Sequence, residues 1–166
     1  MAHINILPDE FLEAVVNRLL SELNMQASSC FIGADPDASP PTPQTIWYVV
    51  SPTPSLQFDE GSFIGGGLSH LTTYSVLTVT IHVAQQQDQG DKADFFYLDD
   101  QRGIYALIRP VLVALAMWNP LKTDGTYMLR EPIIPQDANI TPAQVRGHGS
   151  IQIGLKVSWD WDFVSP

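Results

Sequence analysis

The stretch FIGGGLSHLTTYSVLTVTIHV, residues 63–83, places three consecutive glycines before a long run rich in Thr, Val and Tyr. The run alternates apolar and polar side chains, as in a strand with one buried face, and its apolar members are Leu77, Val79, Ile81 and Val83. A phosphate-binding loop would need a Lys, then Ser or Thr, then a helix after the glycines. No Lys follows, and the next element is a strand. The glycines are therefore interpreted as part of a loop over residues 52–68 that leads into the strand.

A second alternating strand closes the chain. Its apolar positions are Ile151, Ile153, Leu155, Val157, Trp159, Trp161 and Phe163. Both predicted strands approach about 15 residues, whereas a typical strand has about 5 or 6. Strands of this length either bend strongly or extend beyond the body of one subunit.

Two stretches with apolar residues at helical spacing predict amphipathic helices, at about 8 to 24 and about 100 to 117. Pro110 lies inside the second helix and is expected to kink it, at a position that faces away from the apolar stripe. These helices are expected to cover one face of a sheet.

Shorter segments complete the expected fold. Residues 45–51 and 127–134 are predicted strands, and the four prolines within residues 35–45 predict an exposed, stiff loop. The order of elements predicts an α+β fold with a mainly antiparallel sheet of long strands, covered by two amphipathic helices. A length of 166 residues fits one domain, residues 1–166.

Charge is sparse and unbalanced. Charged residues make up 16% of the chain, against roughly 25% in an average soluble protein, which suggests that parts of the surface lie in subunit contacts. The net charge of -10 disfavours binding to DNA by phosphate neutralisation, although DNA could still pass along an acidic wall. Cys30 is expected to be a small side chain that is buried or half-buried.

The sequence also bears on where the protein resides. The N-terminus lacks the charged and apolar regions of a signal peptide, and no apolar run approaches the roughly 20 residues of a membrane-spanning helix. The expectation is a soluble protein made in the cytoplasm, without a membrane partner.

No catalytic motif of the GxSxG or HExxH type is present, and no cofactor or metal site is expected. Asp160 and Asp162 share a strand face roughly 7 Å apart, a spacing found between glycosidase carboxylates, and with His148 they define one alternative: a small hydrolase or sugar-active enzyme. A solvated polar face is the simpler interpretation. Another alternative is a small-molecule binding module with Trp159, Trp161 and Tyr74 lining a cavity.

Four segments together resemble the tail-terminator and tail-completion proteins of long-tailed bacteriophages, which join head and tail. They are the helical PDEFLEAVVNRLLSEL, the strand LTTYSVLTVTIHV, the helical RGIYALIRPVLVAL and the closing strand GSIQIGLKVSWDWDF. The chain departs from the smaller members of that family in its proline loop, residues 35–45, and in its glycine loop near 61–67.

The resemblance implies a virion protein of the neck or tail without catalytic residues. It implies a homo-oligomeric ring, a hexamer, which caps the finished tail tube, stops its polymerisation and meets the head connector, while DNA passes through the lumen without specific binding. A head-side connector or a tail-tube subunit is the neighbouring alternative. The candidate subunit or partner contacts are Phe63, Ile64, Gly65, Gly66, Gly67, Asp160 and Asp162.

Overall fold

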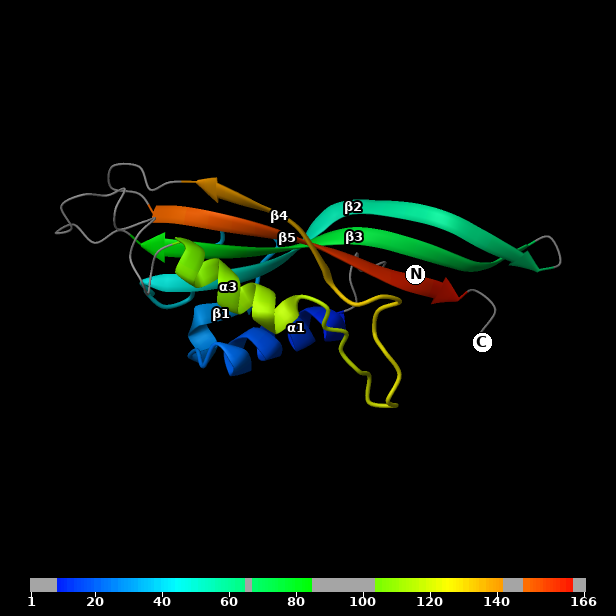
Figure 1. The fold of residues 1–166 in the computed structure, drawn as a ribbon, viewed down its shortest axis with the longest axis horizontal. Helices are drawn as coiled ribbons and strands as arrows, with labels where there is room; N and C mark the ends of the chain where they lie inside the picture. Colours follow the sequence, from blue (N-terminus) through cyan, green and yellow to red (C-terminus); the bar gives the residue numbers. More distant parts are fainter. Residues whose placement is uncertain (1–8, 65–66, 85–103, 142–147, 163–166) are drawn as a thin grey trace.

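The structure is a computed structural model that describes residues 9–64, 67–84, 104–141 and 148–162 (Figure 1). In chain order its elements are helix α1 (Asp9–Glu22), the short 3-10 helix η1 (Ala27–Ser29), strands β1 (Cys30–Ile32), β2 (Ile46–Ile64) and β3 (Gly67–Ala84), helix α3 (Ile104–Leu115), and strands β4 (Ile134–Thr141) and β5 (His148–Asp162). The α+β class predicted from the sequence is confirmed.

The strands form one five-stranded mixed sheet in the order β1-β2-β3-β5-β4. The short β1 runs parallel to β2, and the other three pairs are antiparallel. β3 and β5 pair without a register shift from His70↔Asp162 to Ala84↔His148, and Leu77 lies opposite Leu155. The two alternating strands predicted from the sequence are therefore the central pair.

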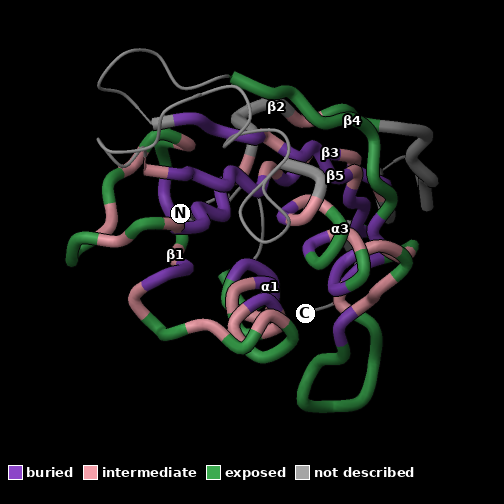
Figure 2. The backbone as a smooth tube through the Cα atoms, turned by 60° about the vertical axis from the view of Figure 1, so that its left-hand side comes forward, coloured by how far each residue is buried: buried purple, intermediate pink, exposed green. Residues whose placement is uncertain are grey.

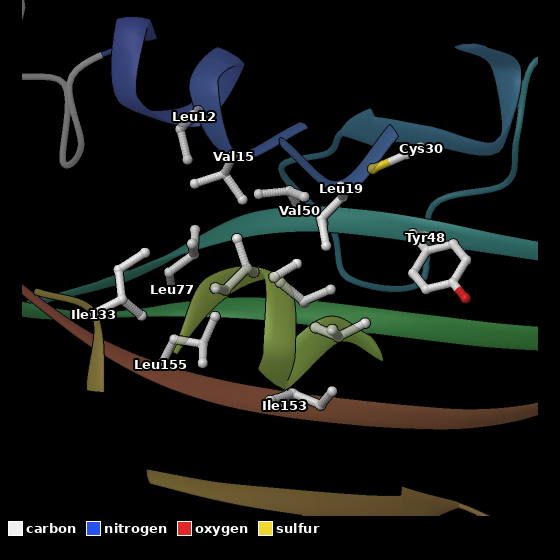
Figure 3. Packing of buried hydrophobic residues seen from close by; sticks show 14 of the residues in the cluster. Leu12, Val15, Leu19, Cys30, Tyr48, Val50, Leu77, Ile133, Ile153 and Leu155 are labelled. Carbon is white, nitrogen blue, oxygen red and sulfur yellow. The ribbon is translucent and has the colours of Figure 1, made fainter. Parts of the chain in front are cut away.

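Helix α1 begins with Asp9 and Glu10, whose charges suit the positive end of the helix dipole. Its buried positions are Phe11, Leu12, Val15 and Leu19. Pro110 lies within α3 and is exposed, as the sequence predicted. In Figure 3 side chains of α1 lie close to those of the strands, and one buried cluster contains residues of both helices together with the alternating residues of β2, β3 and β5.

Two predicted boundaries are wrong. The sequence predicts a loop over residues 52–68, yet residues 52–64 continue β2 and residues 67–68 begin β3. Neighbouring residues of a strand point their backbone groups to alternate sides, and Tyr48 and Val50 face β1. Pro52 therefore faces the outer edge, where no N–H is required.

The predicted strand at 127–134 is the second error, because β4 begins only at Ile134. The side-chain amide of Asn119 takes the place of a strand partner: its Nδ2 donates to Leu129 O at 2.9 Å, and its Oδ1 accepts from Leu129 N at 3.1 Å. The preceding residues form a small turn closed by a bridge between Leu121 and Tyr127.

The proline loop lies on the sheet face opposite the buried cluster. The Nε2 atom of His82 lies 2.7 Å from the carbonyl oxygen of Pro36, and Trp47 Nε1 donates to Ala38 O at 3.2 Å. His82 and Trp47 are both buried beneath this loop. The loop is thus held to β2 and β3 by two side chains whose ring N–H groups donate to its backbone carbonyls.

Candidate assembly interface

Three strands continue past both helices and form a projection, seen at the right of Figure 1. We call it the arm and define it as residues 57–64 of β2, 67–74 of β3 and 158–162 of β5, which pair with one another. Eight extended residues span about 26 Å. Of the two outcomes expected for strands of this length, strong bending or extension beyond the body of the subunit, the arm shows the second.

The arm carries an exposed aromatic side chain. Phe58 is 63% exposed, whereas Thr73 and Trp159, which lie across the sheet beside it, are buried at the base of the arm. The arm is therefore anchored in the core at its base, and at that same level its β2 strand presents a large apolar group. An exposed aromatic of this kind is typical of a contact with another chain.

The structure brings the predicted contact residues to this arm. Ile64 pairs with Gly67, and Phe63 with Leu68, at the end of the β2–β3 hairpin. Gly65 and Gly66, which connect them, lie outside the described residues.

The acidic pair lies on the same projection. Asp160 and Asp162 lie at the C-terminal end of strand β5 and pair with Thr72 and His70 of β3. Residues that the sequence suggests as contacts thus lie in the arm, although the sequence predicts a loop for much of its β2 strand.

Asp160 belongs to a polar cluster at the base of the arm. Its Oδ1 accepts a hydrogen bond of 2.9 Å from Thr72 Oγ1, and Arg130 Nη1 lies 3.3 Å from the same oxygen. Arg130 also donates to the Thr72 hydroxyl. The Asp160 side chain is 37% exposed, which is the environment of an ion-paired surface carboxylate. The side chain of Asp162 is outside the described part of the chain.

The proposed small-molecule cavity is contradicted by the faces on which its residues lie. Trp159 belongs to the buried cluster on the helix side of the sheet. Tyr74 pairs with Ser158, one position along, and so points to the opposite side. There the ammonium of Lys156 lies 4.5 Å from the centre of the Tyr74 ring. Trp159 and Tyr74 therefore cannot line one cavity between sheet and helices.

The two edges of the sheet are further exposed features. Every residue of β4 is exposed, and Figure 2 shows this strand as a continuous green segment beside the buried strands. At the other edge, an open groove of about 450 Å³ separates α1 from β1, lined by Glu13, Val16, Asn17, Cys30, Phe31 and Ile32. Burial raises the pKa of the Cys30 thiol to about 12, so Cys30 is an inert wall of this groove, as expected from the sequence.

Sequence reasoning missed Phe58, Ile32 and Ile140 as exposed apolar residues. Phe58 lies in the segment that the sequence predicts as a loop. Ile32 lies in β1, which has three residues and is too short to show a periodic pattern. Among the described residues, no three His, Cys, Asp or Glu side chains converge in a way that could hold a metal ion. Within the same ranges, no helix has the length and hydropathy needed to cross a membrane.

Comparison with known proteins adds no relative: no protein-family model matches the sequence, and no curated protein matches it.

Proposed function

We propose that the chain is a structural protein of the neck or tail of a long-tailed bacteriophage, a tail terminator. In this account it forms a ring that caps the tail tube, ends its polymerisation and presents a surface to the head connector. The two amphipathic helices cover one face of the sheet and give each subunit a rigid body. The arm reaches from that body to the next protein.

The arm is the observation that carries the proposal. A hairpin built from strands of 19 and 18 residues, anchored in the core and bearing an exposed Phe58, suits a contact with a neighbouring chain better than a monomer in isolation. The sparse charge of the chain supports extensive contacts as well. The net charge of -10 supports a lumen that repels DNA and lets it pass.

The polar cluster around Asp160 supports a structural role over carboxylate catalysis. A general acid works best when its surroundings raise its pKa, which requires burial or a neighbouring negative charge. The Asp160 side chain is instead 37% exposed and lies beside a guanidinium and a hydroxyl, the surroundings of a surface ion pair.

The first test is the mass of the purified chain by light scattering after size exclusion, followed by negative-stain imaging. The proposal predicts closed rings of six copies with a central channel. It also predicts that the rings do not retain duplex DNA at physiological salt. A single-chain mass at tens of micromolar, or tight DNA binding, would count against it.

A further inference from the structure

The outer edge of β4 presents free backbone groups over a short stretch. Arg130 N donates to Ser158 O, which shows that even-numbered residues of the unbroken strand β5 direct their backbone groups toward β4. Asn139 and Thr141, which pair with Gln152 and Ser150, therefore bond inward. The residues between and before them, Ala138 and Ile140, direct N–H and C=O away from the sheet, and no described strand pairs with that edge.

The outer edge of β1 is open in the same way. Gly33 N donates to Val50 O at 3.1 Å, so Phe31 and Gly33 bond toward β2. Cys30 and Ile32 then direct their backbone groups outward, and within the described ranges no strand lies beyond β1. Each side of the sheet thus offers two outward-facing residues.

A proline interrupts each edge next to these open stretches. Pro52 faces outward on β2 just beyond the part that β1 covers, and Pro135 lies opposite Leu155 near the start of β4, where the register then shifts. A proline offers no N–H to an added strand, and edge prolines and bulges are common protections against unwanted pairing. The stretches of β4 and β1 keep free N–H groups beside these prolines, on the body of the sheet and apart from the edges of the arm.

The open stretches match in direction and in face. β4 runs antiparallel to β1 through the chain of pairings across the sheet. Ala138 and Ile140 lie opposite the core residues Ile153 and Ile151, so their side chains point to the helix side. Cys30 and Ile32, opposite Tyr48 and Val50, point to the same side. When outward residues of two antiparallel strands pair directly, their side chains lie on the same face of the sheet. The two open stretches meet this condition, so their pairing would continue the sheet with its faces preserved.

The geometry points to a head-to-tail interface in which β4 of one copy pairs antiparallel with β1 of a second copy. Ile140 lies opposite Cys30, and Ala138 lies opposite Ile32. The interface uses a different edge on each partner, so it is heterologous and generates a ring when its rotation closes. The closure into a ring rests on the proposed function, whereas the pairing rests on the two edges alone.

The groove beside β1 gives the incoming strand room on the helix side. Its walls include the apolar side chains of Val16 and Ile32, and Ile32 is 42% exposed there. Ile140, 38% exposed on its own subunit, would enter this groove and contact α1 of the partner. Two exposed isoleucines and eight backbone groups, two from each of the four outward residues, are covered at once, which is the usual basis of strand addition.

Disulfide trapping tests the pairing. Directly opposed residues of an antiparallel bonded pair have Cα atoms about 5.5 Å apart, within the range that a disulfide spans. We expect the single variants Ile32→Cys and Ala138→Cys, each oxidised alone, to stay uncrosslinked through these positions. Mixed together they form disulfide dimers, and the double variant forms a ladder of higher oligomers. A mixture that stays uncrosslinked overturns the pairing, and so does either single variant crosslinking to itself as readily as the mixture does.

A matched pair of substitutions gives a second readout. Ile134 and Ile140 both lie on β4 with similar exposure, 42% and 38%, but only Ile140 falls in the open stretch. Ile140→Asp places a charge against Glu13 in the groove and is expected to weaken self-association at least tenfold, with an unchanged circular dichroism spectrum. Ile134→Asp is expected to leave self-association unchanged. Equal effects of both substitutions overturn the assigned stretch.

The two proposals fail separately. Crosslinked ladders that never bind a tail tube contradict the tail terminator and leave the strand pairing in place. Rings that cap tail tubes without the Ile32–Ala138 crosslink contradict the strand pairing and leave the function in place.

Discussion

The indole of Trp47 and the imidazole of His82 stack with their ring centres 4.9 Å apart and their planes inclined by 13°. Both rings reach the backbone of the proline loop, Trp47 at Ala38 O and His82 at Pro36 O. A loop that looks independent in the sequence is therefore tied to the central strands by one stacked pair.

Truncation of this pair should release the loop and destabilise the fold. We expect Trp47→Ala to lower the free energy of unfolding by about 3 to 5 kcal/mol, as for other buried aromatic residues. Trp47→Phe keeps a ring against His82 but loses the bond to Ala38 O, and is expected to cost about 1 kcal/mol. Urea unfolding measures both. Leu121→Ala, at an exposed position, is the control and should change the free energy of unfolding by less than about 0.5 kcal/mol. If Trp47→Ala lowers the free energy of unfolding by no more than this control, the packing of Trp47 described above is wrong.

Gly154 provides room for a neighbouring carboxylate. A Cβ built at Gly154 would collide with Asp137 Oδ1, so the Asp137 side chain lies directly over this glycine of β5. Replacing a strand glycine with alanine stabilises by roughly 0.5 to 1 kcal/mol where space allows. We expect Gly154→Ala to reach this gain only when combined with Asp137→Ala. A double-mutant cycle by chemical denaturation measures the coupling, and additive effects would show that the two residues do not compete for space.

Stability should fall at alkaline pH because of two buried groups. Burial raises the pKa of Cys30 to about 12 from 9.0, and burial, together with the Cys30 thiolate, raises that of Tyr48 to about 12 from 10.0. Both groups are neutral when protonated, so the fold favours the protonated forms. Their contribution is fully present below about pH 9 and is lost as the pH rises toward 12.

Thiol reactivity checks the same burial directly. At pH 8 the Cys30 thiol of the folded chain should react with iodoacetamide far more slowly than that of the chain in concentrated urea. Equal rates in the two states would contradict the buried position of Cys30.

The ion pair at the base of the arm should contribute little to stability. Arg130 and Asp160 are 44% and 37% exposed, and exposed pairs are typically worth less than about 1 kcal/mol. We expect Asp160→Asn to lower the free energy of unfolding by no more than about that amount and to leave ring formation intact. Light scattering and urea unfolding test both parts. Complete loss of rings would instead place Asp160 at a subunit contact.

The exposed aromatic of the arm should matter for partners and not for folding. Phe58→Ser is expected to leave the free energy of unfolding within about 0.5 kcal/mol, because the side chain is already exposed. We expect it to weaken attachment of the protein to the tail-tube end at least tenfold, measured by co-sedimentation. Tyr127→Ser, equally exposed on a loop, is the matched control. The same binding by Phe58→Ser and the unchanged protein would remove the arm from the contact.

The central strands were predictable because one face is core. Strict alternation at Val79, Ile81 and Ile153 follows from burial on one side, and their register is fixed by the same burial. The edge strand β4 was not predictable because neither of its faces is buried in the core. β4 is exposed throughout and has no apolar alternation, since nothing on its own chain forces one.

The position of Pro52 explains why the sequence predicts a loop where β2 continues, and why it reveals only part of the arm. Pro52 ends a strand only if its missing N–H faces a partner, and the sequence does not reveal which way it faces. The sequence therefore predicts the long strands β3 and β5, whereas it predicts a loop for the third strand of the arm. Phe63 and Ile64 were still chosen as contacts because they flank the glycines at the end of the hairpin.

The tail-terminator role can be tested most directly by the length of tail tubes. Tail-tube subunits of the same virion would be polymerised with and without the purified chain, and tube lengths and ends would be measured by electron microscopy. The account predicts that elongation stops and that each capped tube carries one ring at its end. Unchanged lengths with bare ends, or incorporation of the chain along the whole tube, would contradict it.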